Sequence, residues 1–191
     1  GYGSQGRGRA ANLRDSGLAV IVGVRPGRSF EAASLDGFTT MPVADAVRKA
    51  DVLAMLVPDE SAAEIFRRDM LPWLHDGQTI VFAHGFNIHY GQIVPPPNVD
   101  VVMVAPKGVG PQVRRLFLED SGVASLIAVH QDVTGSAKQM ALAFAKGIGS
   151  ARSVIMESTF ADETETDLFG EQTVICGGVT HLIKAAYDTL V

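Results

Sequence analysis

The chain has 191 residues, of which 47% are hydrophobic and 19% charged, and its formal net charge is −5. This composition is that of a globular chain large enough for one full domain and part of another, and the acidic balance argues against nucleic-acid binding. The longest apolar stretches, such as residues 53–57, are far short of the about 20 residues that span a bilayer, and the single cysteine, Cys176, favours the reducing cytoplasm.

Short apolar runs alternate with helical patterns over residues 1–158, which is typical of β-α-β units. The expected strands cover residues 19–24, 52–57, 79–83, 101–105, 125–129 and 153–156. The expected helices between them cover residues 6–15, 43–50, 61–71, 111–120 and 136–146. We therefore predict an α/β fold with a Rossmann-type, doubly wound parallel sheet that helices cover on both faces.

The pattern becomes purely helical from Thr159 onward, so we place a domain boundary near Ser158. Residues 159–191 are expected to begin an all-helical C-terminal domain, and an apolar helical pattern continues to Val191. The chain also begins without Met, directly in a glycine loop that needs a strand before it. We therefore expect the chain to be truncated at both ends.

The loop that opens the chain, residues 1–6, fits the pattern G-x-G-x-x-G, in which backbone N–H groups approach a dinucleotide diphosphate at a helix N-terminus. About 20 residues later, NAD-binding chains place an acid that holds the adenosine ribose. This chain instead has Arg25, Arg28 and Ser29 in that loop. Two cations and a hydroxyl suit a 2'-phosphate, so the sequence predicts NADP.

Polar residues follow three expected strands directly, where ligands bind in open parallel sheets. Asp59 and Glu60 follow the second strand, where they either line a cofactor groove or cap the next helix. His84 follows the third strand and is an acid/base candidate. Lys107 follows the fourth and is either a substrate-oxygen contact or a loop lysine.

Three acids recur at four-residue spacing in the C-terminal helical pattern: Glu163, Asp167 and Glu171. On a helix this spacing places them on one face, where like charges repel. Such a face is either solvated or bound to a cation, and a hard divalent ion such as Mg²⁺ prefers carboxylate oxygens.

Several motifs together resemble the ketol-acid reductoisomerase (acetohydroxy acid isomeroreductase) family, in its compact bacterial form, along nearly the whole chain. They are Gly-Tyr-Gly-Ser-Gln-Gly at 1–6, Asn-Leu-Arg-Asp-Ser-Gly at 12–17, His-Gly-Phe-Asn-Ile at 84–88, Val-Ala-Pro-Lys-Gly at 104–108, Leu-Ile-Ala-Val-His at 126–130 and Asp-Leu-Phe-Gly-Glu-Gln at 167–172.

The resemblance implies a Mg²⁺-dependent alkyl migration in 2-acetolactate or 2-aceto-2-hydroxybutyrate, followed by reduction with NADPH, in the biosynthesis of valine, isoleucine and leucine. Two Mg²⁺ ions polarise the substrate in this chemistry. The family also implies a homodimer or higher homo-oligomer that forms through the C-terminal domain.

The resemblance assigns a role to individual residues of this sequence. It implies that His84, Lys107 and Glu163 are catalytic and that Asp167 and Glu171 bind metal. The implied cofactor contacts are Tyr2, Gly3, Ser4 and Gln5 at the diphosphate, Arg25 and Ser29 at the 2'-phosphate, Asp59 and Glu60 in the groove, and Gly110 near the nicotinamide, while Arg28 is a cofactor-binding candidate from its charge and its place in the same loop.

The chain departs from the family pattern in two places. Its loop at 25–30 is one residue shorter than in many members, with Arg28 where a serine is common. The later metal-binding glutamates and a substrate-binding serine would lie beyond Val191, so the resemblance implies that the chain alone is inactive. Two rival interpretations are another NADP-dependent dehydrogenase of the β-hydroxy acid or imine type, and a non-catalytic nucleotide-binding module.

Overall fold

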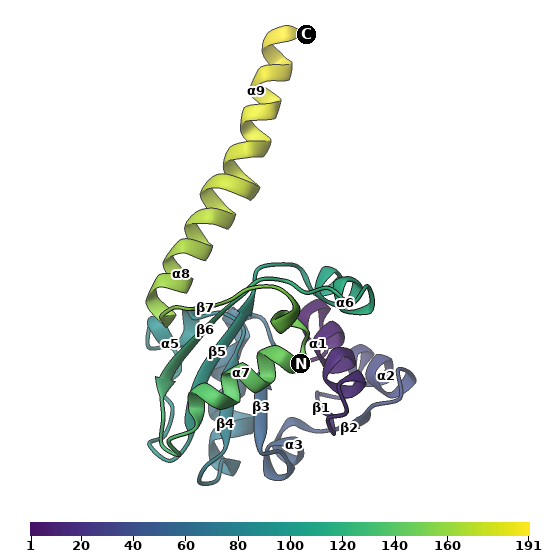
Figure 1. Cartoon of the computed structure of the whole chain (residues 1–191), viewed down its shortest axis with the longest axis vertical. Helices are drawn as coiled ribbons and strands as arrows, with labels where there is room; N and C mark the ends of the chain where they lie inside the picture. The colour runs from purple at the N-terminus through teal and green to yellow at the C-terminus, as the bar shows by residue number, and fades with distance from the viewer.

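The computed structural model describes residues 1–191, except for the side chain of Gln172. Figure 1 shows an α/β body from which one long helical segment projects at the C-terminal end of the chain. The body contains a five-stranded sheet and a separate two-stranded sheet. The Rossmann-like α/β fold expected from the sequence is confirmed. Among the described residues, none of the helices combines the length and the apolar character that crossing a membrane requires.

The larger sheet has the strand order β3-β4-β5-β6-β7. Its strands are β3 (Val52–Met55), β4 (Thr79–Phe82), β5 (Asp100–Pro106), β6 (Ser125–Gln131) and β7 (Ile155–Glu157). The central strand β5 is buried at every residue, which explains its almost uninterrupted apolar sequence. Because β3, β4 and β5 are parallel, their carboxyl ends meet at one edge of the sheet.

One strand pair departs from the parallel arrangement that the sequence predicted, since β5 and β6 are antiparallel. Ser125 at the start of β6 lies opposite Pro106 at the end of β5. The intervening helix α6 (Gly110–Leu118) packs against α1 (Ser4–Asp15) instead of crossing a face of the sheet. The chain therefore re-enters the sheet at the edge that it has just left, and the sheet is mixed.

The smaller sheet pairs β1 (Ile21–Gly23) in parallel with β2 (Thr39–Met41), with α2 (Arg28–Leu35) between them. The sequence patterns did not predict α2 or β2, because α2 buries only Ala33 and β2 has three residues. Gly1 bridges the two sheets. Its amine donates to the Gly23 carbonyl at 3.3 Å, and a Cβ at Gly1 would lie 2.0 Å from the Leu56 carbonyl oxygen.

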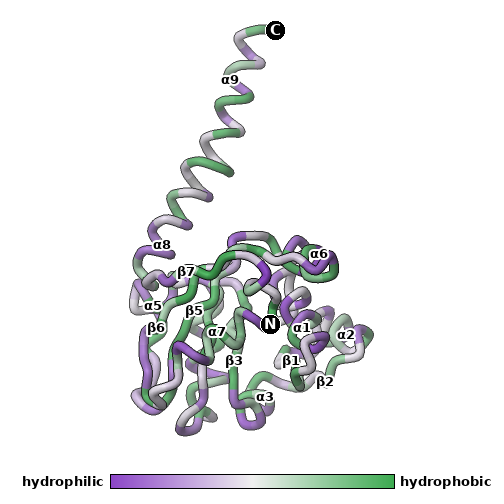
Figure 2. The backbone as a smooth tube through the Cα atoms, viewed as in Figure 1, coloured by the Kyte–Doolittle hydropathy of each residue, from purple (hydrophilic) through white to green (hydrophobic). Residues whose placement is uncertain are grey.

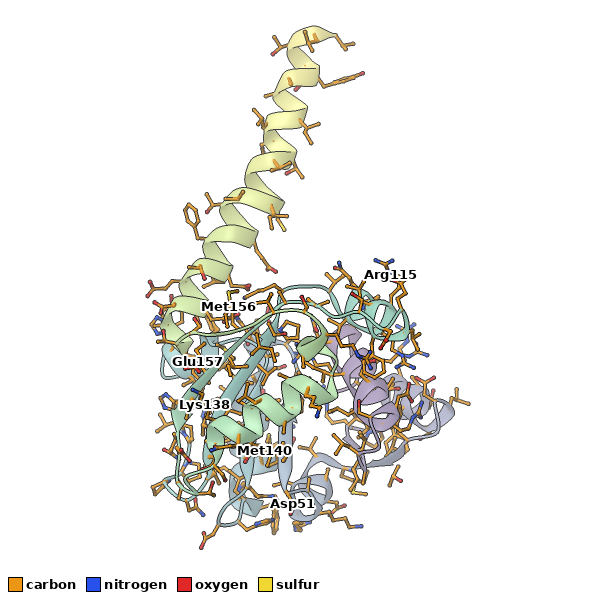
Figure 3. The ribbon with its side chains drawn as sticks, in the orientation of Figure 1. Asp51, Arg115, Lys138, Met140, Met156 and Glu157 are labelled. Atoms are coloured by element: carbon orange, nitrogen blue, oxygen red, sulfur yellow. The ribbon has the colours of Figure 1, made fainter. Side chains whose placement is uncertain are left out.

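Helices cover both faces of the larger sheet, as the sequence predicted (Figure 1). Helix α7 (Ala137–Gly147) and the 3₁₀ turn η3 (Ser150–Arg152) belong to one side, where Ala141 and Phe144 join the core with Val102. Lys138 of α7 also forms an ion pair with Glu157 of β7, and Figure 3 places the two side by side.

The opposite face is covered by α3, α4 and the short helical segments that follow them. Their bounds are α3 (Val43–Lys49), α4 (Asp59–Ile65), the π-helical η1 (Phe66–Met70), the 3₁₀ turn η2 (Leu71–Trp73) and α5 (Phe86–His89). Val47, Phe66 and Ile80 are each 1% exposed or less in this second core. The sequence predicted one helix over 61–71, but α4 begins earlier, directly after Pro58.

The C-terminal segment is a continuous run of helix through α8 (Phe160–Leu168), the π-helical η4 (Phe169–Val179) and α9 (Thr180–Leu190). The Thr159 hydroxyl caps it by accepting the Asp162 N–H at 2.9 Å. Apolar and polar residues alternate along the projecting part in Figure 2. Its large apolar side chains are exposed, Leu182 by 71% and Tyr187 by 63%.

Candidate functional site

A cavity of about 670 Å³ lies at the carboxyl ends of β3, β4 and β5, beside the first turn of α1 and one face of α8 and η4. Nine of the residues that the sequence placed in a site line this cavity: Gly3, Ser4, Gln5, Asp59, His84, Lys107, Glu163, Asp167 and Glu171. The other six do not line it: Tyr2, Arg25, Arg28, Ser29, Glu60 and Gly110.

Glu163 is the centre of a polar network in this cavity, with a side chain that is only 1% exposed. Its Oε2 accepts the Gly85 N–H and contacts His84 Nδ1, both at 2.9 Å. Lys107 Nζ donates to Glu163 Oε1 and to Asp167 Oδ1, both at 2.7 Å. The ends of β4 and β5 are thus joined to α8 by one set of charge-assisted hydrogen bonds.

The charges in this network shift one another's pKa values. Burial alone would raise the pKa of Glu163, but hydrogen bonds from His84, Lys107 and the Gly85 N–H outweigh it and hold that pKa below its ordinary value. Burial alone would lower the pKa of His84 and of Lys107, but the Glu163 and Asp167 carboxylates raise both. At neutral pH Glu163 is therefore ionised and Lys107 protonated, and His84 keeps its proton to a higher pH than a free histidine.

Gly85 allows α8 to approach the end of β4 this closely. A Cβ at this position would lie 2.3 Å from Thr164 Oγ1 and 2.4 Å from the Phe160 carbonyl oxygen. Any side chain at Gly85 would therefore push α8 outward. The glycine that follows His84 thus brings Glu163 within hydrogen-bond distance of that histidine.

The glycine loop and α6 meet in a second close contact. A Cβ at Gly110 would lie 2.0 Å from the Ser4 carbonyl oxygen, and one at Gly8 would lie 2.7 Å from the Gly110 carbonyl oxygen. Gly110 is buried in this contact, outside the lining of the cavity. In this structure its evident role is the packing of α6 on α1.

Tyr2 directs its side chain away from the cavity. The ring is buried at 7% exposure in a core with Phe38, and its hydroxyl donates to Asp36 Oδ2 at 2.6 Å. Burial, and then the Asp36 carboxylate, raise the pKa of Tyr2 to about 12. Tyr2 can therefore meet a dinucleotide only through its backbone.

Arg25, Arg28 and Ser29 lie together after β1, at the N-terminus of α2, and all three are exposed. Gly27 between them has φ 131°, a conformation that favours glycine. Glu60 is also exposed, in the first turn of α4. Its neighbour Asp59 does not cap that helix, because its carboxylate accepts the Asn87 amide at 2.9 Å.

The cavity brings together groups that could hold a divalent cation. One ligand atom each from His84, Glu163 and Asp167 lie within 4.8 Å of one another. Glu171, one turn further, lines the same cavity. Oxygen donors from carboxylates suit Mg²⁺, and Asp167 has a second oxygen besides the one that Lys107 contacts.

Two buried polar residues of the cavity were not predicted from the sequence: Arg9 on α1 and Asn87 on α5, which are 1% and 2% exposed. Each was within reach of a simple signal. Arg9 stands four residues after Gln5, on the same helix face, and Asn87 stands three residues after His84. A charged or amide residue on a helix face that packs against a sheet is therefore a candidate site residue.

Comparison with known families gives two matches that together cover almost the whole chain. Residues 1–154 match the family described as acetohydroxy acid isomeroreductase, NADPH-binding domain. Residues 160–191 match the family described as ketol-acid reductoisomerase, C-terminal domain.

Among solved structures, an NADH-preferring ketol-acid reductoisomerase from an uncultured archean is 43% identical, with a TM-score of 0.95 over 100% of this chain. The chain spans 59% of the length of that relative.

Other solved structures share the fold at much lower identity. A semialdehyde dehydrogenase NAD-binding protein from Cupriavidus necator is 18% identical, with a TM-score of 0.80 over 99% of this chain and 71% of its own. A putative oxidoreductase from Jannaschia sp. CCS1 is 15% identical, with a TM-score of 0.76 over 96% of this chain and 69% of its own. These two similarities concern the fold alone.

Proposed function

Because the chain belongs to the acetohydroxy acid isomeroreductase (ketol-acid reductoisomerase) family, we propose that it carries the dinucleotide-binding domain and part of the catalytic site of such an enzyme. The reaction is an alkyl migration in 2-acetolactate or 2-aceto-2-hydroxybutyrate, followed by hydride reduction to the 2,3-dihydroxy acid. One observation carries the proposal: the network around Glu163 shares a single cavity with the glycine loop.

The side chains of this network have complementary roles in that chemistry. His84 uses Nδ1 on Glu163, so Nε2 is left to donate or accept a proton at a substrate oxygen. The Lys107 ammonium stabilises negative charge on substrate oxygens. Glu163 contacts both and fixes their positions, because it is buried and accepts three hydrogen bonds.

Asp167 and Glu171 are the metal ligands that this chain would contribute to a pair of Mg²⁺ ions. When bound, the divalent ions supply Lewis-acid polarisation of the substrate oxygens and stabilise the charge that develops during migration. The position of both carboxylates at the cavity supports this assignment.

The cofactor we propose is NADPH, held by the loop after β1. Arg25, Arg28 and Ser29 offer two guanidinium groups and a hydroxyl at the N-terminus of α2, which has no side-chain cap. Glu31 in the same turn is the one acid of that turn. The archaeal relative prefers NADH, so the ratio of NADPH to NADH affinity is a direct test of this loop.

A homodimer or higher homo-oligomer in the cytoplasm completes the proposal. The exposed apolar side chains of α9, Leu182, Ile183, Tyr187 and Leu190, support a packing partner for this helix. We further propose that residues 1–158 form the dinucleotide-binding domain and that residues 159–191 begin the C-terminal domain.

The decisive experiment is a fusion in which the chain replaces the matching part of the archaeal relative, so that the relative supplies every segment that this chain does not cover. With Mg²⁺ and 2-acetolactate, the fusion should oxidise NADPH, and EDTA should abolish that oxidation. We expect the 191-residue chain alone to bind NADPH without turnover.

Asp167→Asn in the fusion separates the proposal from its rivals. Turnover should fall by at least about a hundredfold, because one metal ligand loses its charge, while NADPH affinity stays unchanged. Glu165→Gln, on the same helix and 66% exposed, is the matched control and should keep full activity. Metal-independent reduction of other keto acids would instead favour a dehydrogenase of the β-hydroxy acid type.

A further inference from the structure

Arg9 is a buried cation for which the described residues supply no carboxylate partner. Its side chain is 1% exposed on α1 and lines the cavity beneath the glycine loop. Burial lowers its pKa to about 10, so it is charged at neutral pH. A buried guanidinium without a counter-charge is unfavourable for folding, which calls for a compensating role.

The other arginines of α1 make the contrast plain. Arg7 is 64% exposed and contacts Asp36 at 2.8 Å, and Arg14 is 44% exposed and lies 3.8 Å from Asp15. The arginines that water already solvates thus have carboxylate neighbours. The arginine that most needs a negative partner does not have one among the described side chains.

Arg9 instead donates to two neutral oxygens, one on β5 and one on its own helix. Nη1 donates to the Val104 carbonyl of β5 at 3.4 Å, and Nη2 donates to Gln5 Oε1 at 3.2 Å. Gln5 Nε2 in turn donates to the Gly108 carbonyl at 3.3 Å. The first turn of α1 is therefore connected to the loop that carries Lys107.

Unsatisfied polar atoms gather at the same cavity. Within the described side chains, the buried nitrogen and oxygen atoms without a hydrogen-bond partner are Arg9 Nε and Asn87 Oδ1. Both residues line the cavity. Buried polar atoms normally have partners, so their coincidence here points to a site that a polar ligand completes.

We propose that Arg9 is a positioning residue for the dinucleotide, which acts through Gln5. Its positive charge lies behind the first turn of α1, and the diphosphate supplies the counter-charge that the protein lacks. Its hydrogen bond to Gln5 also fixes the bridge to Gly108, so that the bound dinucleotide and Lys107 keep a constant relative position. This inference rests on the proposed dinucleotide binding at the glycine loop.

A purely structural role makes the opposite prediction for stability. If Arg9 served only to hold α1 on β5, its replacement would lower the thermal midpoint of the ligand-free chain. If it serves the ligand, Arg9→Met removes a charge that destabilises the ligand-free fold. The midpoint should then stay the same or rise, while affinity for the dinucleotide falls.

The test is calorimetric titration of the 191-residue chain with NADPH and with NADH, alongside thermal unfolding without ligand. Arg9→Met should lower the affinity for each dinucleotide by at least about tenfold and to the same extent, because both contain the diphosphate. Arg9→Lys, which keeps the charge but not the guanidinium fork, should lose less. Arg14→Met, on the same helix and outside the cavity, should leave both affinities unchanged.

Each result decides the matter. A loss of dinucleotide affinity smaller than about tenfold in Arg9→Met overturns the inference but leaves the proposed function intact. If Arg9→Met does not fold, the same two measurements are made on Arg9→Lys. A lower thermal midpoint of Arg9→Lys together with unchanged dinucleotide affinity overturns the inference. If the unchanged chain binds neither dinucleotide, the proposed function falls together with the inference.

Discussion

The two ends of the C-terminal helical segment stand in contrast. At its start, α8 places Glu163 in full burial between the ends of two strands, with a partner for each carboxylate oxygen. At its end, α9 exposes Leu182 by 71% and Leu190 by 85%. Polar groups are thus satisfied inside the body while apolar groups are exposed outside it. The difference teaches that the charged end is assembled within this chain, whereas the apolar end leaves large side chains exposed, as the proposed packing partner of α9 requires.

Within the C-terminal helical segment, the largest expected effect comes from removing the centre of the assembled end. Glu163→Ala should lower the free energy of unfolding by about 3 kcal/mol, the lower end for a broken buried ion pair, because Lys107 remains 35% exposed. Urea denaturation of the chain measures the change. Glu165→Gln is the matched control and should shift stability by less than about 0.5 kcal/mol. Equal losses in the two variants would contradict the special position of Glu163.

A somewhat smaller effect is expected where α8 touches the strand end. Gly85→Ala places a methyl group 2.4 Å from the Phe160 carbonyl oxygen and should destabilise the chain by about 1–3 kcal/mol. Gly170→Ala is the control, since a Cβ there would meet no described atom within 4 Å. That replacement should be neutral or stabilising by up to about 1 kcal/mol. Chemical denaturation of both variants tests the contrast.

The pH dependence of stability should be smaller and have a definite sign. Because the folded pKa of His84 is raised above 6.5, its contribution is complete below pH 6.5 and is lost as pH rises through the folded value. Because the folded pKa of Glu163 is lowered below 4.5, its contribution is present above pH 4.5 and is lost as pH falls through the folded value. The pair therefore contributes most between about pH 4.5 and 6.5.

Unfolding of the chain and of His84→Asn in EDTA measures this window. The difference in unfolding free energy between the two should be larger at pH 5.5 than at pH 8.5. A difference that grows with pH would show that the charged histidine is not favoured in the folded state.

The smallest effect should come from the exposed end. Leu182→Ala should change the unfolding free energy of the monomeric chain by less than about 0.5 kcal/mol, because the side chain loses little burial. Ile80→Ala in the core, where the side chain is fully buried, should lower it by about 2–5 kcal/mol. Sedimentation velocity tests the proposed role of α9 in self-association, which Leu182→Ala should weaken.

Local patterns were enough to predict much of this arrangement. Continuous apolar runs in the sequence predicted the buried strands. The spacing of Glu163, Asp167 and Glu171 predicted that they share one helix face, and all three line the cavity. The positions of His84 and Lys107 followed from the rule that ligands bind beyond the carboxyl ends of parallel strands. His84 and Lys107 both contact Glu163 because α8 returns to the edge of the sheet where β4 and β5 end.

Other features depend on contacts that no local pattern encodes. The Tyr2 hydroxyl meets Asp36, which is 34 residues away, and Arg9 meets Val104, which is 95 residues away. The reversal of β6 depends on where α6 packs, and the α1 contact that fixes it involves Gly8 and Gly110. Arg25, Arg28 and Ser29 lie on the surface, so their role remains a prediction that only a ligand can test.

The wide turns of η4, which carries Glu171, separate Glu163 and Asp167 of α8 from the apolar side chains of α9. Each residue advances the direction of its side chain about the helix axis, by about 100° in an α-helix and by less in the wider turns of a π-helix, so the number of residues in η4 sets the phase between the two sets. Deleting one residue there would rotate Leu182 and Tyr187 by less than about 100° about the helix axis while Glu163 stayed in place. The length of η4 would thus set how any partner of α9 is oriented relative to Glu163.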